Sequence, residues 1–141
     1  MSEPGDGSDA EALSPACGVV VAHGDMAHGL VEAVRQIAGV SEDTLAPVPN
    51  QGLGRDGLCA AIRGAFHGGR HVIFTDLPSG SCHLAAMLVA REMSEVAVVT
   101  GVNLPMLLDF VFKRGLPLNE LVPRLTEKGQ NGIDGHRPIS S

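Results

Sequence analysis

The chain has 141 residues, enough for one domain with a hydrophobic core and too few for two ordinary domains. It contains four Phe, no Tyr and no Trp, and its formal net charge is -6, a balance that disfavours base stacking and binding to a phosphate backbone. No uninterrupted apolar run approaches the roughly 20 residues of a transmembrane helix, so we expect neither nucleic-acid binding nor membrane insertion.

Residues 1–15 are rich in Gly, Ser, Pro and acidic side chains, a composition typical of a disordered acidic tail. They lack the basic and apolar regions of a signal peptide, so we expect a cytoplasmic protein. Cys17, Cys59 and Cys82 are odd in number and form no C-x-x-C pair. We therefore expect reduced thiols rather than a disulfide framework or a structural zinc site.

Strand and helix patterns alternate along the first half of the chain. Residues 18–22 (GVVVA) are predicted to form a strand buried on both faces, as in a parallel sheet. A helix follows and stops at Gly39, and the prolines near a weaker strand over 44–48 indicate a short or irregular element. A second helix comes next. The apolar stripes that predict the two helices are Met26, Leu30, Val34 and Ile37, and Leu58, Ile62 and Phe66.

The alternation continues in the second half. Residues 71–75 (HVIFT) are predicted to form the third strand, and the turn 76–81 (DLPSGS) leads from it into a helix. Residues 95–100 (EVAVVT) are predicted to form the fourth strand, and Pro105 and Pro117 each suit the first turn of a short helix. The residues expected to share one face of the helix between the last two strands are Leu84, Ala85 and Leu88.

This order of elements predicts an α/β fold, a three-layer sandwich with a mainly parallel sheet of four to five strands flanked by helices. We expect the domain to span residues 16–130 and a loosely ordered tail to follow over 131–141. In such sheets ligands bind at the carboxyl ends of the strands. The loop 22–24 after the first strand and the turn 76–81 after the third are therefore expected to converge.

His23 is the candidate catalytic residue. Its ring is expected above the sheet, beside free helix amides that stabilise an anion such as a phosphoryl group, and a neutral imidazole nitrogen is a competent nucleophile near pH 7. Asp76 is placed to accept a hydrogen bond from the other ring nitrogen and to fix the tautomer. Amides and hydroxyls for the phosphoryl oxygens are expected from Gly24, Ser79, Gly80 and Ser81.

Two other interpretations of these loops are open. In the first, His23 caps a turn and Asp76 caps a helix without further function, although their occurrence together at adjacent strand ends favours a functional pair. In the second, the Gly-x-Gly-x-x-Gly pattern of residues 52–57, with an acidic residue about 20 positions later, is a dinucleotide fingerprint. Prolines and polar residues precede that pattern where a buried strand is required, which disfavours the dinucleotide interpretation.

A metal site is a further alternative, because histidines are numerous for this length. His23 and His28 are five residues apart and would diverge on a helix, and a Gly-Gly turn separates His67 from His71. We therefore expect most histidines at the surface or in loops, and neither a metal nor a cofactor. The full set of candidate ligands is His23, His28, His67, His71, Cys82 and His83.

Three motifs resemble those of mannose-type enzyme IIA domains of the bacterial sugar phosphotransferase system. Residues 22–30 (AHGDMAHGL) are similar to the family's His-Gly-x-x-Ala-x-Gly-Leu start, and 76–81 (DLPSGS) to its Asp-Leu-x-Gly-Gly-Ser loop. Residues 101–108 (GVNLPMLL) are similar to its Gly-Val-Asn-Leu-Pro-Met-Leu segment. The motifs come in the family's order and spacing, and the likeness extends from about Gly18 to Gly129.

The resemblance implies a phosphocarrier. His23 would be phosphorylated by the histidine phosphocarrier protein and would pass the group to an enzyme IIB, with Asp76 orienting the ring. Domains of this family have a parallel sheet flanked by helices and are commonly homodimers in which a late strand pairs across the interface. We expect Asp25, His28 and His83 near the site, where they would contact a partner protein.

The sequence departs from the family motifs at two places. Ser79 replaces the first glycine of the loop, and Cys82-His83 replace a Pro and an aromatic residue, which affects loop geometry and docking more than phosphorylation. A regulatory phosphocarrier without a transporter, and the phosphotransfer subunit of a dihydroxyacetone kinase, share this histidine chemistry and stay open. The segment 101–108 favours the mannose-type branch.

Overall fold

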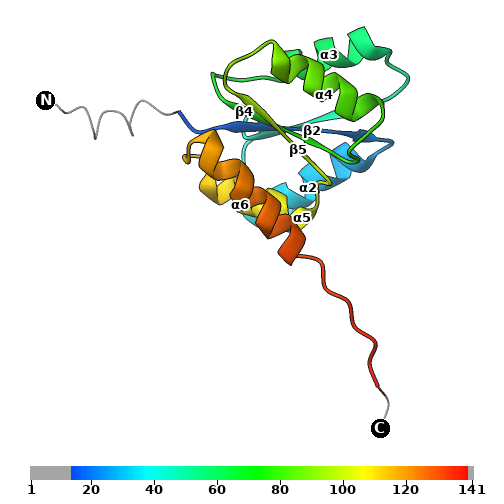
Figure 1. The fold of residues 1–141 in the computed structure, drawn as a ribbon, viewed down its shortest axis with the longest axis vertical. Coiled ribbons are helices and arrows are strands. Elements are labelled where there is room, and N and C mark those ends of the chain that lie inside the picture. The colour runs from blue at the N-terminus through cyan, green and yellow to red at the C-terminus, as the bar shows by residue number, and fades with distance from the viewer. Residues whose placement is uncertain (1–13, 140–141) are drawn as a thin grey trace, which may run out of the picture.

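The computed structural model describes residues 14–139, so the predicted tail 1–15 lies almost wholly outside the described residues. The strands form one parallel sheet in the order β3-β2-β4-β5 (Figure 1), which confirms the predicted α/β class. The elements in chain order are β2 (Cys17–His23), α2 (Met26–Ala38), β3 (Leu45–Asn50), α3 (Arg55–Gly64), β4 (His71–Thr75), α4 (Ser81–Arg91), β5 (Val96–Thr100), α5 (Leu104–Lys113) and α6 (Leu118–Asn131).

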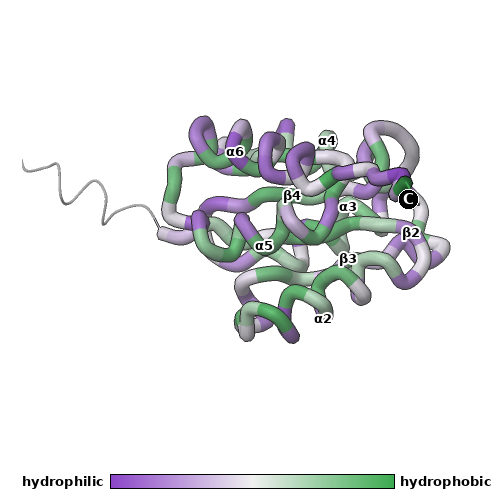
Figure 2. Tube along the Cα trace, turned by 90° about the horizontal axis from the view of Figure 1, so that it is seen from below, coloured by the Kyte–Doolittle hydropathy of each residue, from purple (hydrophilic) through white to green (hydrophobic). Residues whose placement is uncertain are grey.

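The sheet separates two layers of helices. Helices α2, α5 and α6 pack on one face and α3 and α4 on the other (Figure 1). Along β2, Val20 and Ala22 belong to the first core and Val19 and Val21 to the second, the period of two expected of a strand. Because both faces of β2 are covered, its sequence is an unbroken apolar run. Hydrophobic residues accordingly follow the central strands, whereas much of α6 is hydrophilic (Figure 2).

The strand order creates a switch point between β2 and β4. The chain leaves β2 for β3 on one side and then returns past β2 to β4 on the other. Helix α2, which makes the first crossover, and α3, which makes the second, lie on opposite faces, as right-handed connections require. The loops that follow β2 and β4 therefore start side by side and diverge, which is where open α/β sheets bind their ligands.

Strand β3 is regular and runs to Asn50, two residues beyond its predicted end. Its neighbour in the described sheet is β2 alone, so β3 is an edge strand. Pro47 and Pro49 are two residues apart, and both ring nitrogens therefore face the same side of the strand. With both nitrogens on the free edge, no hydrogen bond to β2 is lost, which explains how the prolines fit a regular strand.

Two helices bury a face that overlaps the predicted one only in part, since Val34 of α2 and Ala85 of α4 are buried as expected. Helix α2 packs Ala27 and Val31 on the sheet, whereas Met26 and Ile37 are exposed. In α4 Leu84 is exposed, and the buried side chains are Cys82, Ala85, Ala86 and Val89. In both helices small residues make the closest contacts with the sheet, so choosing the largest apolar residues misplaced the helix face by about one position.

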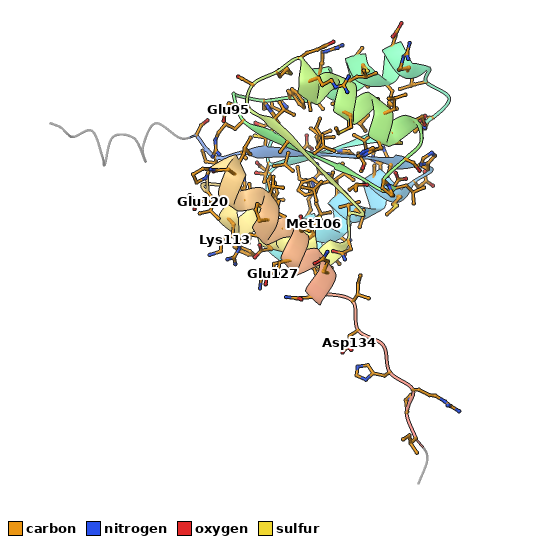
Figure 3. All side chains as sticks on the ribbon, in the orientation of Figure 1. Glu95, Met106, Lys113, Glu120, Glu127 and Asp134 are labelled. Atoms are coloured by element: carbon orange, nitrogen blue, oxygen red, sulfur yellow. The ribbon has the colours of Figure 1, made fainter. Side chains whose placement is uncertain are left out.

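Helix α6 is longer than predicted, and Pro117 lies immediately before it rather than in its first turn. Leu121 and Leu125 are buried against the core. Figure 3 shows Glu120 and Glu127 on the outer side of α6, where both are exposed. Residues 132–139, which fall in the predicted C-terminal tail, extend away from the domain without helix or strand and are exposed (Figure 1).

We predict that Gly18→Ala destabilises the fold by about 1–3 kcal/mol, because overpacking a core costs that much. A Cβ at Gly18 would lie 2.7 Å from Leu45 Cδ1 and 2.9 Å from Phe110 Cε2. The matched control is Gly29→Ala on the exposed side of α2, where a Cβ meets nothing within 4 Å. That change should stabilise the fold by about 0.5–1 kcal/mol through helix propensity. Urea unfolding measures both, and equal effects would contradict the packing argument.

Candidate functional site

His23 and Asp76 meet at the carboxyl edge of the sheet. His23 is the last residue of β2, Asp76 follows the last residue of β4, and the two strands are neighbours. Asp76 Oδ2 lies 2.7 Å from His23 Nδ1 and accepts a hydrogen bond from the His23 backbone amide at 2.9 Å. Asp76 Oδ1 accepts from the Leu77 amide, also at 2.9 Å. The structure thus brings together the two residues that the sequence suggested as a catalytic pair. Both carboxylate oxygens of Asp76 accept hydrogen bonds from backbone amides.

The pair is exposed on one side only. The His23 side chain is 51% exposed, whereas that of Asp76 is 8% exposed and lies behind the ring. Within the described part of the chain, no hydrogen bond engages Nε2 of His23. This nitrogen is therefore accessible to a second molecule.

Electrostatics keep Asp76 ionised. Burial alone would raise the pKa of Asp76, but hydrogen bonds from the ring and the backbone amide of His23, together with the charge on His23, outweigh burial and lower it below the usual carboxyl range. An ionised carboxylate accepts hydrogen bonds and cannot donate them, so Nδ1 of His23 carries the proton. In the tautomer that this hydrogen bond selects, the lone pair is on Nε2.

Two helices begin at this edge. Gly24 follows His23 with φ of 56° and Gly80 precedes α4 with φ of 93°, left-handed conformations that turn the chain from each strand into its helix. The first turns of α2 and α4 have backbone N–H groups without intrahelical partners, which can bind an anion. The four predicted phosphoryl ligands are exposed beside these turns. Ser81 is the first residue of α4, and Gly24, Ser79 and Gly80 lie in the loops just before the two helices.

Two further residues lie at the site: Asn50, which had no predicted role, and Cys82, which the sequence offered only among the candidate metal ligands. Asn50 ends β3 in register with His23, and its Nδ2 donates to Ser81 Oγ at 2.7 Å. Its signal was available, because it is a polar residue at the carboxyl end of a predicted strand. Cys82 Sγ lies 3.8 Å from His23 Nδ1, and burial and the Asp76 carboxylate raise the pKa of its thiol. No spacing in the sequence indicates that proximity.

The residues predicted to contact a partner take different positions. Asp25 and His28 are exposed at the start of α2, and in the structure of residues 14–139 no hydrogen bond joins either of them to His23. His83 is half-buried, with Nδ1 3.2 Å from the Thr75 hydroxyl. The expectation that most histidines lie at the surface or in loops is confirmed, since His23, His28 and His67 are exposed. His71 is an exception, 1% exposed because it begins a central strand and stacks on a phenylalanine ring.

The glycine pattern 52–57 does not have the geometry of a dinucleotide site. It follows β3, which lies at the sheet edge, whereas the fingerprint follows a central strand at the switch point. The acidic residue that would bind a ribose, Asp76, is engaged by His23.

None of the helices described between residues 14 and 139 is long and apolar enough to cross a lipid bilayer.

Solved structures with the same fold come from several bacteria. The phosphotransferase system component EIIA from Streptococcus agalactiae is 22% identical over 84% of this chain and 95% of its own, with a TM-score of 0.77. The mannose/sorbose-specific IIA subunit of the phosphotransferase system from Enterococcus faecalis is 20% identical over 91% and 99%, with a TM-score of 0.77. A sigma-54 interaction domain protein from Enterococcus faecalis is 14% identical over 86% and 95%, with a TM-score of 0.68.

No curated protein sequence matches the chain. The sequence model of one family, described as the PTS system fructose IIA component, matches residues 18–123. That range contains the sheet except for Cys17, and it includes His23, Asp76 and the loops around them. The chain therefore belongs to the fructose and mannose IIA family of the sugar phosphotransferase system.

Proposed function

We propose that the protein accepts a phosphoryl group on Nε2 of His23 from the histidine phosphocarrier protein and passes it to an enzyme IIB. The observation that carries this proposal is the hydrogen bond between Asp76 and Nδ1, because it leaves the lone pair on the exposed nitrogen. Family membership supports the same role, since the family comprises IIA components of the phosphotransferase system. A histidine that only caps a turn needs no carboxylate beside its ring, so the neighbouring carboxylate of Asp76 favours a functional role for His23.

In the proposed step the Nε2 lone pair attacks the phosphorus atom of the donor's phosphohistidine. The new N–P bond forms as the donor's N–P bond breaks, and that electron pair returns to the donor nitrogen. Positive charge develops on the His23 ring and is stabilised by Asp76, which keeps its negative charge throughout. The phosphoryl oxygens face the N-terminal ends of α2 and α4. Amides and hydroxyls at these ends and in the loops before them come from Gly24, Ser79, Gly80 and Ser81.

Partner proteins would dock around the ring. Met26 and Leu77 are 41% and 54% exposed and flank the loops that carry His23 and Asp76. Together with Asp25 and His28 they form an apolar and polar rim to which the donor and the acceptor could bind in turn. A homodimer stays part of the proposal on family grounds. Such a carrier works in the cytoplasm, where both partners and the reduced thiols would be found.

We predict that His23→Ala abolishes phosphorylation and that His28→Ala does not. Enzyme I, the histidine phosphocarrier protein and phosphoenolpyruvate should add one acid-labile phosphoryl group to the unmodified chain, because phosphoramidate bonds hydrolyse in acid. Intact-protein mass spectrometry and radiolabel transfer measure the addition. His28 is the matched control because it is an exposed histidine five residues away on the same strand-to-helix segment. Label that persists in the His23 variant would place the phosphorylation site elsewhere.

Asp76→Ala should slow phosphorylation by about 10²-fold or more while the domain stays folded, the size of effect usual for a group that assists proton placement. Asp56→Asn, an exposed carboxyl group in the first turn of α3, is the control and should leave the rate unchanged. Single-turnover transfer from phosphorylated donor measures the rate, and circular dichroism checks the fold. An unchanged rate in folded Asp76→Ala would remove the carboxylate from the mechanism.

The same pair should give the fold a specific pH dependence. Because folding lowers the pKa of Asp76, its contribution to stability is complete above the unfolded value of about 4 and is lost as the pH falls through the folded value. The free-energy difference between the wild type and Asp76→Asn should therefore be largest near neutral pH and shrink in acid. Urea unfolding between about pH 3 and pH 7 measures it. A difference that grows in acid would reverse the assigned direction of the pKa shift.

A regulatory phosphocarrier is the second candidate. It rests on the shared fold with the sigma-54 interaction domain protein from Enterococcus faecalis. Mixing the phosphorylated chain with the enzyme IIB encoded closest to it distinguishes the two roles. Rapid loss of label to IIB supports sugar uptake, and retention of label supports regulation.

A further inference from the structure

Three metal-binding atoms of different chemistry converge behind the His23 ring. His23 Nδ1, a carboxylate oxygen of Asp76 and Cys82 Sγ all lie within 4.8 Å of one another. They come from the end of β2, the loop after β4 and the first turn of α4. We propose that these three side chains bind one Zn²⁺ ion, and that the bound ion prevents phosphorylation of His23.

The distances suit a tetrahedral ion after a small adjustment. Zinc binds imidazole nitrogen at 2.0–2.1 Å, carboxylate oxygen at 2.0–2.2 Å and thiolate sulfur at about 2.3 Å, which separates ligand atoms by about 3.3–3.6 Å. The separation of 3.8 Å between His23 Nδ1 and Cys82 Sγ is already close to this range. The separation of 2.7 Å between Nδ1 and Asp76 Oδ2 has to open by about 0.6–0.8 Å as the ion replaces the shared proton.

The donor set matches zinc in charge and softness. A thiolate and a carboxylate carry two negative charges, so a divalent ion makes the site neutral at a place where Cys82 is fully buried and Asp76 nearly so. Thiolate and imidazole favour zinc over magnesium or calcium, which prefer oxygen ligands alone. A water molecule would complete the tetrahedron as the fourth ligand, as in zinc sites with three protein ligands.

The surrounding backbone already orients one ligand. Asp76 Oδ1 accepts the Leu77 amide and Oδ2 accepts the His23 amide, so the carboxylate cannot rotate freely. Outer hydrogen bonds of this kind contribute tenfold to a hundredfold to metal affinity in zinc enzymes. Cys82 belongs to one of the two places where the sequence departs from the family motifs, so the proposed site is a property of this chain rather than of the fold.

Zinc binding would move two protons. The Cys82 thiol releases its proton to solvent as the Zn–S bond forms, and the ring gives up the Nδ1 proton and takes one on Nε2. Nε2 then carries N–H in place of the lone pair that attacks phosphorus, so the zinc-bound ring is not a nucleophile. The inhibition rests on the proposed phosphocarrier function, whereas the metal site does not.

The site is tested first without any phosphotransfer partner. The reduced full chain is titrated with Co²⁺ alone and then with Zn²⁺, and its absorption spectrum is recorded. Separate calorimetric titrations use Zn²⁺ and Mg²⁺. We expect a thiolate-to-cobalt charge-transfer band that Zn²⁺ removes, one Zn²⁺ per chain, and no Mg²⁺ binding. Cys82→Ala should abolish the band and weaken zinc binding at least tenfold, and Asp76→Asn should also weaken zinc binding at least tenfold. Cys59→Ala, which removes another buried thiol, should change neither the band nor the zinc affinity.

A missing band in the wild type, or a band that survives in Cys82→Ala, overturns the site. If Cys82→Ala does not fold, the affinity of Asp76→Asn decides in its place, and unchanged zinc binding there overturns the site as well.

The second test uses donor that has been phosphorylated in advance. The metal-free rate of each protein, wild type and Cys82→Ala, is the reference for its own rate with zinc. Equimolar Zn²⁺ should slow phosphorylation of the wild type at least tenfold and leave Cys82→Ala unaffected. Equal inhibition of both proteins overturns the competition. If neither protein is phosphorylated with or without metal, the proposed function fails, and the cobalt band still decides whether the metal site exists.

Discussion

The hydrogen bond between Asp76 and Nδ1 of His23 is the interaction on which the site depends. It determines which ring nitrogen carries the proton, and therefore which nitrogen can react. The same carboxylate also accepts the His23 backbone amide, so it holds the end of β2 as well as the ring. One buried anion thus orients a ring that is otherwise half exposed and that we propose as the nucleophile. Without that anion, His23 would be an ordinary surface histidine free to adopt either tautomer.

The sheet makes this hydrogen bond possible. Strands β2 and β4 lie side by side at the centre, where helices cover both faces and limit their movement. Their carboxyl ends point toward the same edge, so the residues that follow them are close although 53 positions separate them in sequence. At the opposite edge buried Arg70 donates to the carbonyl groups of Ser14 and Leu116, which ties the loops there together. The covered centre and the tied edge support the loops that carry His23 and Asp76 at the other end of the sheet.

The chain combines a family scaffold with a local feature of its own. The family match places the chain among the IIA components of the phosphotransferase system, and solved structures such as two IIA proteins share its fold. Cys82 adds a soft ligand within reach of the histidine and the carboxylate. In this arrangement the proton on Nδ1 would favour phosphotransfer and an ion in its place would oppose it. Whether a proton or a zinc ion is bound to Nδ1 would then decide whether Nε2 can react.

The sequence by itself determined the alternation of strands and helices, the bounds of β4 and the occurrence of His23 and Asp76 at neighbouring strand ends, because strand periodicity and chain order are local properties. It misplaced the buried faces of α2 and α4, where small residues rather than the largest ones meet the sheet. Only the tertiary structure decided that Cys82 lies beside the His23 ring and that Asn50 reaches Ser81. Those contacts depend on how each helix is rotated and placed against the sheet, and that packing is set by the whole core rather than by any segment of the sequence.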